Sequence, residues 1–447
     1  MSDFDGARAT VMGLGRFGGG VGVARWLAAR GADVLVTDLE PEDRLRASIA
    51  ALADLIDAGS VRLRLGEHNV SDFTTRDLVV ANPAVPTPWD NRFLRAARAA
   101  GVHVTTEIAL LVERLSARER VIGVTGTVGK STTAAMIAAG LTSAGRPVAL
   151  GGNIGGSLLG NLDTLDPAAW IVLELSSAML HWLGETGWSP GVATVTGFAP
   201  NHVDWHGSLE HYEASKRKIL AFQLPGDACV LGSSVHEWPS ATGVQRTLVD
   251  PSNRVDALRV PGAHNAANAA LALAACKASG ANPDACERGI RAFEGLPHRL
   301  QAVCDARAGA GVIRFFNDSK ATTPDATLVA IDAVRPLGPI HLIAGGYDKG
   351  IDLSPIARAA PSLAGLYTIG ATGDALARAA TTNAEPCGTL DAAVSRAFER
   401  ARPGDVVLLS PGCASWDQFE NYERRGEAFC RLVLERAEAT RCAHSSG

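Results

Sequence analysis

The sequence predicts an α/β protein with three domains, each built on a mostly parallel sheet. Three observations support this prediction. Short β-branched runs alternate with Ala-rich helical stretches along the chain, which is the pattern of strand–helix–strand units. Glycine-rich turns at residues 13–18 and 126–129 each follow an apolar run and precede a helical stretch. At 447 residues the chain is too long for one hydrophobic core, and its length is typical of about three domains.

The first domain is expected to span residues 1–112 and to be Rossmann-like. Residues 9–13, 33–37 and 77–81 are typical of strands, and a helical stretch at residues 21–30 ends at Gly31, where a C-terminal cap belongs. The first strand leads into Gly13-Leu-Gly-Arg-Phe-Gly18, and Asp38 follows the second. This spacing resembles a dinucleotide-binding turn, so a nicotinamide-dependent dehydrogenase is one alternative that the first domain raises.

The second domain, residues 113–298, is expected to resemble a P-loop ATPase. An apolar strand at residues 120–125 runs into Gly126-Thr-Val-Gly-Lys-Ser-Thr132, and a helix-forming stretch follows. Backbone N–H groups of such a turn can hold phosphate oxygens, Lys130 can reach the terminal phosphates, and the Ser131 hydroxyl can bind magnesium. A glycine-rich turn without a ligand is the alternative. Apolar runs at residues 170–175 and 192–196 continue a buried, mostly parallel sheet.

The third domain, residues 299–447, is expected to be a second Rossmann-like α/β unit. Strands are predicted at residues 312–316, 340–344, 366–369 and 405–409, again alternating with Ala-rich helices.

Composition narrows the class of protein. Hydrophobic residues make up 47% and charged residues 20%, the balance of an ordinary globular protein, and the net charge of −5 gives no basic field for nucleic acid. The first residues lack the pattern of a signal peptide or a membrane anchor, which predicts a cytoplasmic protein with no membrane insertion. The eight scattered cysteines show no zinc-type spacing and are expected to be reduced thiols.

Glu174 ends an apolar strand, a position that aims a carboxylate at the phosphate loop, and magnesium prefers such oxygen ligands. A solvated glutamate at a strand end is the alternative. His202 and Lys216 are unremarkable by themselves, since a loop histidine and a helix lysine are usually structural.

Further motifs occur in a fixed order along nearly the whole chain. They are Gly151-Gly-Asn-Ile-Gly155, Leu173-Glu-Leu-Ser-Ser177, His202-Val-Asp204, Tyr212-Glu-Ala-Ser-Lys216, His264-Asn265 with Asn268, Leu296-Pro-His-Arg299, Asn317-Asp-Ser-Lys-Ala-Thr322, Gly345-Gly-Tyr-Asp-Lys349 and Ser410-Pro-Gly-Cys-Ala-Ser-Trp-Asp-Gln-Phe419. Together with the phosphate loop, this set resembles the Mur ligase family. The stretches at residues 317–322 and 417–419 are most similar to the glutamate-adding members.

The resemblance implies an ATP-dependent ligase of cell-wall peptidoglycan synthesis. Such an enzyme joins D-glutamate to UDP-N-acetylmuramoyl-L-alanine through an acyl phosphate. Its implied cofactors are ATP, two Mg²⁺ ions and a carbamylated Lys216, and its implied state is a monomer. The implied catalytic residues are Lys130, Glu174, His202 and Lys216, and the implied metal ligands are Ser131, Glu174, His202 and Lys216.

The resemblance also assigns residues to three binding sites. ATP is expected to contact Gly126, Thr127, Val128, Gly129, Lys130, Ser131, Thr132, Asn268, Arg299 and Asp318. The UDP-linked precursor is expected to contact Gly13, Leu14, Gly15, Arg16, Asp38, Asn82 and Asn153. The glutamate substrate is expected to contact Lys320, Thr322, Lys349, Ser415 and Phe419, where two lysines suit a dicarboxylate.

Three positions depart from the family pattern. Val128 replaces a common Asn, Asn201 replaces a common Asp, and Trp416 replaces a smaller apolar residue or Phe beside the glutamate site. Ligation of L-glutamate is therefore an alternative, and a ligase like folylpolyglutamate synthetase is another, although such ligases lack the N-terminal domain. A non-catalytic ATP switch is a third alternative, and it would hydrolyse ATP without an amino acid.

Overall fold

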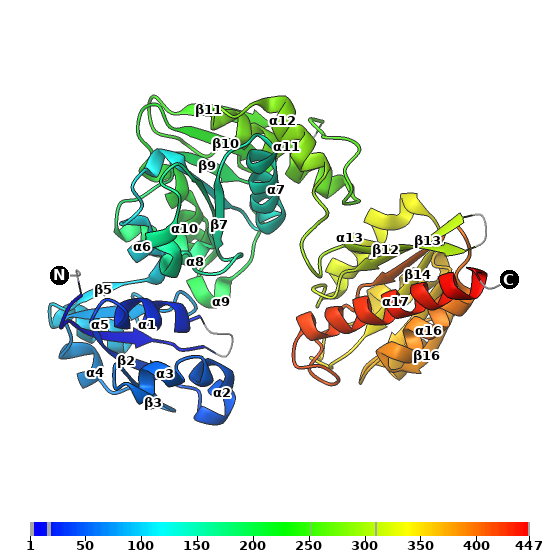
Figure 1. The fold of residues 1–447 in the computed structure, drawn as a ribbon, viewed down its shortest axis with the longest axis horizontal. Coiled ribbons are helices and arrows are strands. Elements are labelled where there is room, and N and C mark those ends of the chain that lie inside the picture. Colours follow the sequence, from blue (N-terminus) through cyan, green and yellow to red (C-terminus); the bar gives the residue numbers. More distant parts are fainter. Residues whose placement is uncertain (1–3, 16–18, 251, 309–310, 446–447) are drawn as a thin grey trace. The chain divides into compact units, whose positions relative to one another are not determined.

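The computed structural model describes residues 4–15, 19–250, 252–308 and 311–445, and within them it forms three sheets (Figure 1). By compactness the chain divides into two units, residues 1–254 with 268–290 and residues 255–267 with 291–447. The first two sheets belong to the first unit and the third sheet belongs to the second. The predicted α/β class with three domains is confirmed, while the boundaries at residues 112/113 and 298/299 stay predictions.

The N-terminal sheet has the order β3-β2-β1-β4-β5, and all its strands are parallel. Side chains alternate along β1 and β4 between two apolar clusters, so both faces of the sheet are buried. Its elements are β1 (Arg8–Met12), α1 (Val21–Ala28), β2 (Asp33–Asp38), α2 (Glu42–Ala50), α3 (Ala53–Asp57), β3 (Val61–Leu65), α4 (Ser71–Thr74), β4 (Leu78–Ala81), α5 (Arg92–Ala99), β5 (His103–Thr105) and α6 (Glu107–Val112).

The central sheet has the order β11-β10-β9-β6-β8-β7 and is also parallel throughout. Helix α7 packs on β6, β7 and β8, whereas α10 packs on β6 and α8. The elements are η1 (Arg118–Arg120), β6 (Val121–Thr125), α7 (Lys130–Ser143), β7 (Val148–Gly152), η2 (Leu159–Thr164), β8 (Trp170–Glu174), α8 (Ser177–Glu185), β9 (Val192–Val195), α9 (Val203–His206), α10 (Leu209–Ala221), β10 (Ala228–Gly232), η3 (Ser233–Val235), β11 (Gln245–Val249), α11 (Ala263–Ala278) and α12 (Pro283–Arg291).

The C-terminal sheet has the order β12-β13-β17-β14-β15-β16, and only its edge pair, β12 and β13, is antiparallel within the described residues. Alternate residues of β14 and β17 enter two separate apolar clusters, one on each face. The elements are β12 (Gln301–Ala308), β13 (Gly311–Asn317), α13 (Pro324–Val334), η4 (Arg335–Leu337), β14 (Ile340–Gly345), α14 (Ser354–Ala359), η5 (Ala360–Ser362), β15 (Gly365–Ile369), α15 (Gly373–Ala379), β16 (Ala384–Gly388), α16 (Leu390–Arg400), β17 (Val406–Leu409) and α17 (Tyr422–Ser445).

Parallel strands place their carboxyl ends at one edge of a sheet, and ligands of open α/β sheets bind there. The three groups of predicted site residues largely follow this rule. Most of these residues lie at or after the carboxyl ends of neighbouring strands, whereas Asn268 lies within α11, Arg299 precedes β12, and Asn153 follows β7 of the central sheet. No helix in the described part of the chain is both long enough and apolar enough to cross a membrane.

Candidate active site

The phosphate loop lies between β6, the inner strand of the central sheet, and α7. Gly126 and Gly129 have φ values of 144° and 86°, which favour glycine at both positions. A Cβ on Gly129 would come within 2.4 Å of the Asn268 side-chain oxygen, so this part of the loop lies against α11. The loop is closed by hydrogen bonds from the Thr127 amide to the Gly197 carbonyl (2.9 Å) and from the Thr196 hydroxyl to the Val128 carbonyl (2.5 Å).

The start of α7 has the features of a phosphate site. The first amides of a helix have no partner within it and carry the positive end of its dipole. Lys130 begins α7 and its amine donates to the Thr127 carbonyl at 3.0 Å, so its charge lies over the loop. The Ser131 and Thr132 side chains are buried beside it, whereas the Val128 side chain is 74% exposed and leaves only its backbone for the loop.

Glu174 is the last residue of β8, as the sequence predicted, and its side chain is buried. Asn153, from the turn after β7, donates a hydrogen bond to Glu174 Oε1 at 3.1 Å. Glu174 Oε2 is buried without a hydrogen-bond partner. A buried carboxylate oxygen without a hydrogen-bond partner is suited to bind a cation. The contact of Asn153 with Glu174 was not predicted, since Asn153 was expected only near the precursor.

Lys216 lies in the interior, at 1% exposure, although an exposed helix lysine was the ordinary expectation. Its amine donates to the Gly126 carbonyl at 2.8 Å and lies 4.7 Å from the centre of the Tyr212 ring. Burial, with the nearby charge of Lys130, lowers the pKa of Lys216 to about 7, and Glu174 opposes that shift. A substantial fraction of this amine is therefore neutral near pH 7.

His202 directly precedes α9, at the end of the loop that follows β9, and has φ 51° in the left-handed region. Burial and the positive charges of Lys216 and Lys130 lower the pKa of His202, so its imidazole is neutral at pH 7 and can bind a metal. The structure thus brings Lys130, Glu174, His202 and Lys216 close enough to influence one another electrostatically. Asn201 turns its side-chain oxygen to the His202 amide at 2.8 Å.

Tyr212 begins the motif that ends at Lys216, but no role was predicted for it. It is fully buried one helical turn before Lys216, and its hydroxyl bonds to the Thr127 hydroxyl at 3.1 Å. The spacing of four residues to Lys216 on one helix was the available signal.

In the N-terminal sheet, the predicted precursor residues follow three adjacent strands. Asp38 ends β2 and accepts from the Gly15 amide at 2.9 Å, while Asn82, after β4, approaches the Gly13 carbonyl at 3.5 Å. Leu14 is fully buried, so only its backbone can meet a ligand. Arg16 and Gly18 lie outside the described residues.

A short connection joins the precursor region to the His202 segment. The Trp205 indole donates to the Pro83 carbonyl at 3.0 Å, and the Thr87 amide donates to the Trp205 carbonyl at 3.2 Å. These two hydrogen bonds therefore tie the loop after β4 to helix α9.

In the second unit, Asp318 is a buried carboxyl group that lies within the electrostatic influence of Arg299. Asp318 follows β13, accepts from the Ser410 hydroxyl (2.8 Å) and the Leu300 amide (3.1 Å), and is 6% exposed. Burial raises the pKa of Asp318 to about 7, and the charge of Arg299 opposes that change.

The predicted glutamate residues follow three adjacent parallel strands: Lys320 and Thr322 come after β13, Ser415 after β17 and Lys349 after β14. Lys320 and Lys349 are exposed, and Ser415 is buried. The Phe419 ring packs against the apolar core, whereas Tyr422 lies 5.5 Å from the Lys320 amine by its ring centre. Tyr422 is therefore an aromatic neighbour of Lys320 that no sequence pattern indicated.

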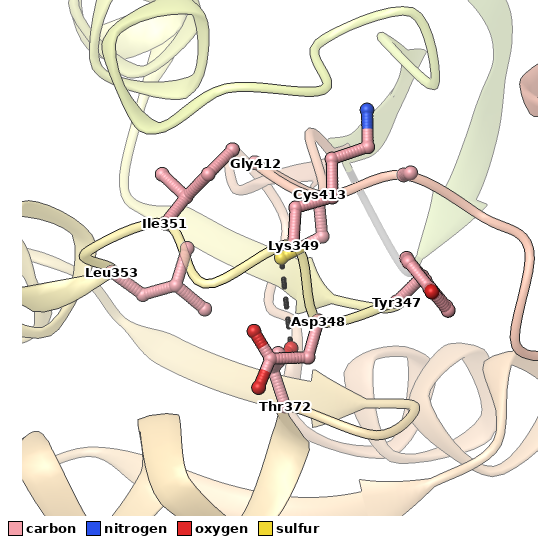
Figure 2. Close-up of a pocket in the computed structure, with 9 residues that line it drawn as sticks. Tyr347, Asp348, Lys349, Ile351, Leu353, Thr372, Gly412 and Cys413 are labelled. Carbon is pink, nitrogen blue, oxygen red and sulfur yellow. Dashed lines mark hydrogen bonds between the residues drawn. The ribbon is translucent and has the colours of Figure 1, made fainter.

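A small pocket adjoins Lys349, lined by residues 347–349, 351, 353, 372 and 412–414 (Figure 2). Figure 2 shows the Cys413 sulfur turned to the Thr372 hydroxyl, 3.6 Å away. Burial raises the pKa of the Cys413 thiol, which fits a packed residue and not a nucleophile. Trp416 is 59% exposed, and the Lys349 amine lies 4.5 Å from its ring centre.

Comparison with known proteins accounts for all three domains. A model of the Mur ligase MurD-like N-terminal domain matches residues 7–106, the Mur ligase middle domain matches residues 124–245, and the Mur ligase glutamate ligase domain matches residues 298–413. Curated relatives match over nearly their whole length. UDP-N-acetylmuramoylalanine–D-glutamate ligase of Roseiflexus sp. (strain RS-1) is 38% identical over 96% of this chain and 98% of its own. The enzyme of the same name from Gloeobacter violaceus is 39% identical over 96% and 99%.

Solved structures show the same fold at low identity. UDP-N-acetylmuramate–alanine ligase from Thermotoga maritima superposes with a TM-score of 0.56 at 19% identity, covering 97% of this chain and 100% of its own. A bifunctional folylpolyglutamate synthase/dihydrofolate synthase from Yersinia pestis has a TM-score of 0.50 at 20% identity and covers 73% of this chain and 92% of its own.

Proposed function

The chain belongs to the Mur ligase family, and from this premise we propose that it joins D-glutamate to the alanyl carboxylate of UDP-N-acetylmuramoyl-L-alanine, with conversion of ATP to ADP and phosphate. The reaction is a step of peptidoglycan synthesis. The observation that carries the proposal is the phosphate loop, with Lys130 over it and Glu174 and Lys216 beside it. Relatives that match nearly the whole chain have the D-glutamate-adding activity in their names.

The chemistry explains why such a site is needed. A carboxylate is a poor electrophile until ATP converts it to an acyl phosphate, and the amine of glutamate then displaces phosphate. Both steps gather negative charge on oxygens, so fixed positive charge and N–H donors lower the barrier. Lys130 and the first amides of α7 are the groups of this chain that we assign to the γ-phosphate and its transition state.

The donor groups around the loop fit magnesium. Glu174 Oε2 is a buried oxygen with no hydrogen-bond partner, Ser131 in the first turn of α7 supplies a hydroxyl, and His202 is a neutral imidazole. In the described residues no three His, Cys, Asp or Glu side chains converge as a ready metal site, so further oxygens must come from elsewhere. When bound, magnesium would neutralise phosphate charge. We propose two ions, held by Ser131, Glu174, His202 and modified Lys216.

Carbamylation of Lys216 would supply part of the missing oxygen. In this reaction the neutral amine attacks carbon dioxide, an N–C bond forms, and one amine proton is released. The buried Lys216 has a pKa of about 7, whereas an ordinary lysine stays protonated at neutral pH. The product is an anion with two oxygens, formed beside Lys130 and loop carbonyls. A lysine that remains unmodified would instead add a second cation to the site of Lys130.

The remaining proposals assign residues to the three substrates. We assign the UDP-linked precursor to Gly13, Leu14, Gly15, Arg16, Asp38, Asn82 and Asn153, with Leu14 acting through its backbone. We assign ATP to the loop with Asn268, Arg299 and Asp318, and glutamate to Lys320, Thr322, Lys349 and Ser415, with Tyr422 beside or in place of Phe419. We expect a monomer that works in the cytoplasm, where UDP-linked precursors and ATP are present.

The test is phosphate release measured with and without UDP-N-acetylmuramoyl-L-alanine and with D- or L-glutamate. Release that requires the precursor and D-glutamate is the expected result. Equal rates with L-glutamate would favour the alternative stereochemistry, and release without any amino acid would indicate a nucleotide switch and not a ligase. Activity on a folate substrate alone would place the chain with the folylpolyglutamate ligases.

A further inference from the structure

Arg425 is among the largest fully buried side chains of the protein, with 1% of its surface exposed. It lies in the first turn of α17 and its guanidinium donates four hydrogen bonds. Nε bonds the Ser319 hydroxyl (3.0 Å), Nη2 bonds the Ser319 carbonyl (2.9 Å) and the Cys413 carbonyl (3.0 Å), and Nη1 bonds the Ala414 carbonyl (3.1 Å). All four acceptors are neutral.

No carboxylate pairs with this guanidinium among the residues that the structure describes. Burial lowers the pKa of Arg425 to about 10, so the group is still charged at neutral pH. Asp417, the carboxylate whose charge acts on it, turns one oxygen to the Ala371 amide at 2.8 Å instead. A buried cation without a counter-ion is costly, and here only hydrogen bonds to neutral acceptors offset that cost.

The loops that Arg425 joins are those assigned to the amino acid substrate. Ser319 directly precedes Lys320 in the loop after β13, and Cys413 and Ala414 directly precede Ser415 in the loop after β17. One planar guanidinium thus fixes the backbone of both loops across two adjacent strands. A lysine amine could not make the same four bonds, because it lacks the planar fork of donors.

We propose that Arg425 is a positioning residue for the glutamate substrate. It holds the two loops so that Lys320, Thr322 and Ser415 face the same space, and its unneutralised charge favours a dicarboxylate there. Arg425 does not touch the substrate in this proposal. The inference rests on the proposed ligation of glutamate and adds the residue that orders its acceptor site.

The test compares Arg425→Lys and Arg425→Met with the wild type in the complete reaction. We expect the KM for D-glutamate to rise by roughly 10- to 100-fold in Arg425→Lys, the factor for one or two lost hydrogen bonds of a charged group. Arg425→Met, which also loses the charge, should be affected more. The KM values for ATP and for the UDP-linked precursor should change less than about twofold, since a factor of two is only ~0.4 kcal/mol.

Arg424→Lys is the matched control, because Arg424 lies beside Arg425 on α17 but is exposed and pairs with Glu427. It should leave all three KM values unchanged. If Arg425→Lys does not fold, Ser319→Ala decides, since it removes a single acceptor and should raise the KM for D-glutamate severalfold. Equal changes in all three KM values, or lower thermal stability with an unchanged KM for D-glutamate, would show a merely structural arginine. A wild type that does not use D-glutamate would overturn the proposed function instead.

Discussion

The Lys216 amine and the Gly126 carbonyl are 2.8 Å apart, so a side chain of α10 holds the first residue of the phosphate loop by a hydrogen bond. Carbamylation would leave one N–H on the lysine nitrogen, and this hydrogen bond could persist while two oxygens are added. The support of the loop and the charge of the modified side chain are therefore separable by mutation.

Lys216→Ala should be inactive, and short carboxylic acids should restore part of its rate because they return oxygens to the vacated space. Phosphate release with and without acetate measures this effect. Arg217→Ala, which changes the exposed neighbour, should be unaffected. Equal rescue by chloride would mean that the acids act only through ionic strength. Full activity of Lys216→Ala in carbon-dioxide-free buffer would reduce Lys216 to a structural residue.

Unmodified Lys216 should also make stability depend on pH. Its folded pKa of about 7 lies below the unfolded value of 10.5, so between these values the unfolded chain binds more protons and stability rises with pH. In carbon-dioxide-free buffer, the wild type should therefore gain stability relative to Lys216→Met from pH 7 towards pH 10. Thermal unfolding at each pH checks this, and a constant difference between the two proteins would contradict it.

Lys130→Ala should lose ligation by roughly 100- to 1000-fold, the usual effect of removing one donor to developing charge. The fold should survive, since the Lys130 amine bonds the loop carbonyl of Thr127 and Lys130 is not part of an apolar core. Far-UV circular dichroism and phosphate release together test this, with exposed Lys277→Ala as control. Turnover near that of the wild type would remove Lys130 from the phosphate site.

Glu174→Gln keeps an oxygen for Asn153 but removes the charge, whereas Glu174→Ala removes both. We expect both variants to need more magnesium, with activity only partly restored at high concentration, and the alanine variant to be worse. Magnesium titration of phosphate release is the measurement, and Glu210→Gln on the surface is the control. An unchanged magnesium dependence would exclude Glu174 from the metal site.

His202 adopts φ 51°, a backbone conformation that favours glycine, whereas the proposed metal site needs the imidazole side chain. His202→Gly should lose activity while its thermal stability stays the same or rises. His202→Val should lower the free energy of unfolding by about 1–2 kcal/mol, because a β-branched residue is strained in the left-handed region. Equal stability of the two variants would show that the segment rearranges freely.

Asp318 should make the C-terminal domain less stable as the pH rises. Its folded pKa of about 7 exceeds the unfolded value of 3.8, so the stabilisation is full below pH 3.8 and is lost as the pH passes 7. Asp318→Asn should therefore gain on the order of 2–4 kcal/mol relative to the wild type between pH 5 and pH 8. Asp325→Asn, which changes an exposed residue, should show no such trend. If Asp318→Asn also shows no trend relative to the wild type, the Asp318 carboxyl group is ionised throughout this pH range.

Much of the fold was predictable because each predicted strand is apolar and ends at a turn residue. The same pattern predicted that Glu174 would end a strand, and parallel pairing then brought it near the phosphate loop. No strand was predicted for the edge strands of the three sheets, β3, β5, β7, β11, β12 and β16, or for the inner strand β10. An edge strand such as β12 pairs on one side only and lacks a long apolar run.

The side-chain contacts of the site could not be predicted from the sequence to the same extent. Arg425 looks like any charged residue in a Glu-Arg-Arg stretch, and only the tertiary fold shows that it is buried while Arg424 is not. The depth of Lys216 likewise depends on how α10 packs on β6, which no local pattern records.

The position of β6 has a consequence for how the protein is made. Its two neighbours come later in the chain, since Val121 pairs with Ile171 of β8 and Ile122 pairs with Val192 of β9. The hydrogen bonds that close the phosphate loop also come from Thr196 and Gly197. Because synthesis proceeds from the N-terminus, a nascent chain that ends before Gly197 contains the whole Gly126–Thr132 segment without its closing contacts. A nucleotide site built on this loop is therefore expected to be incomplete on the ribosome until Gly197 has emerged.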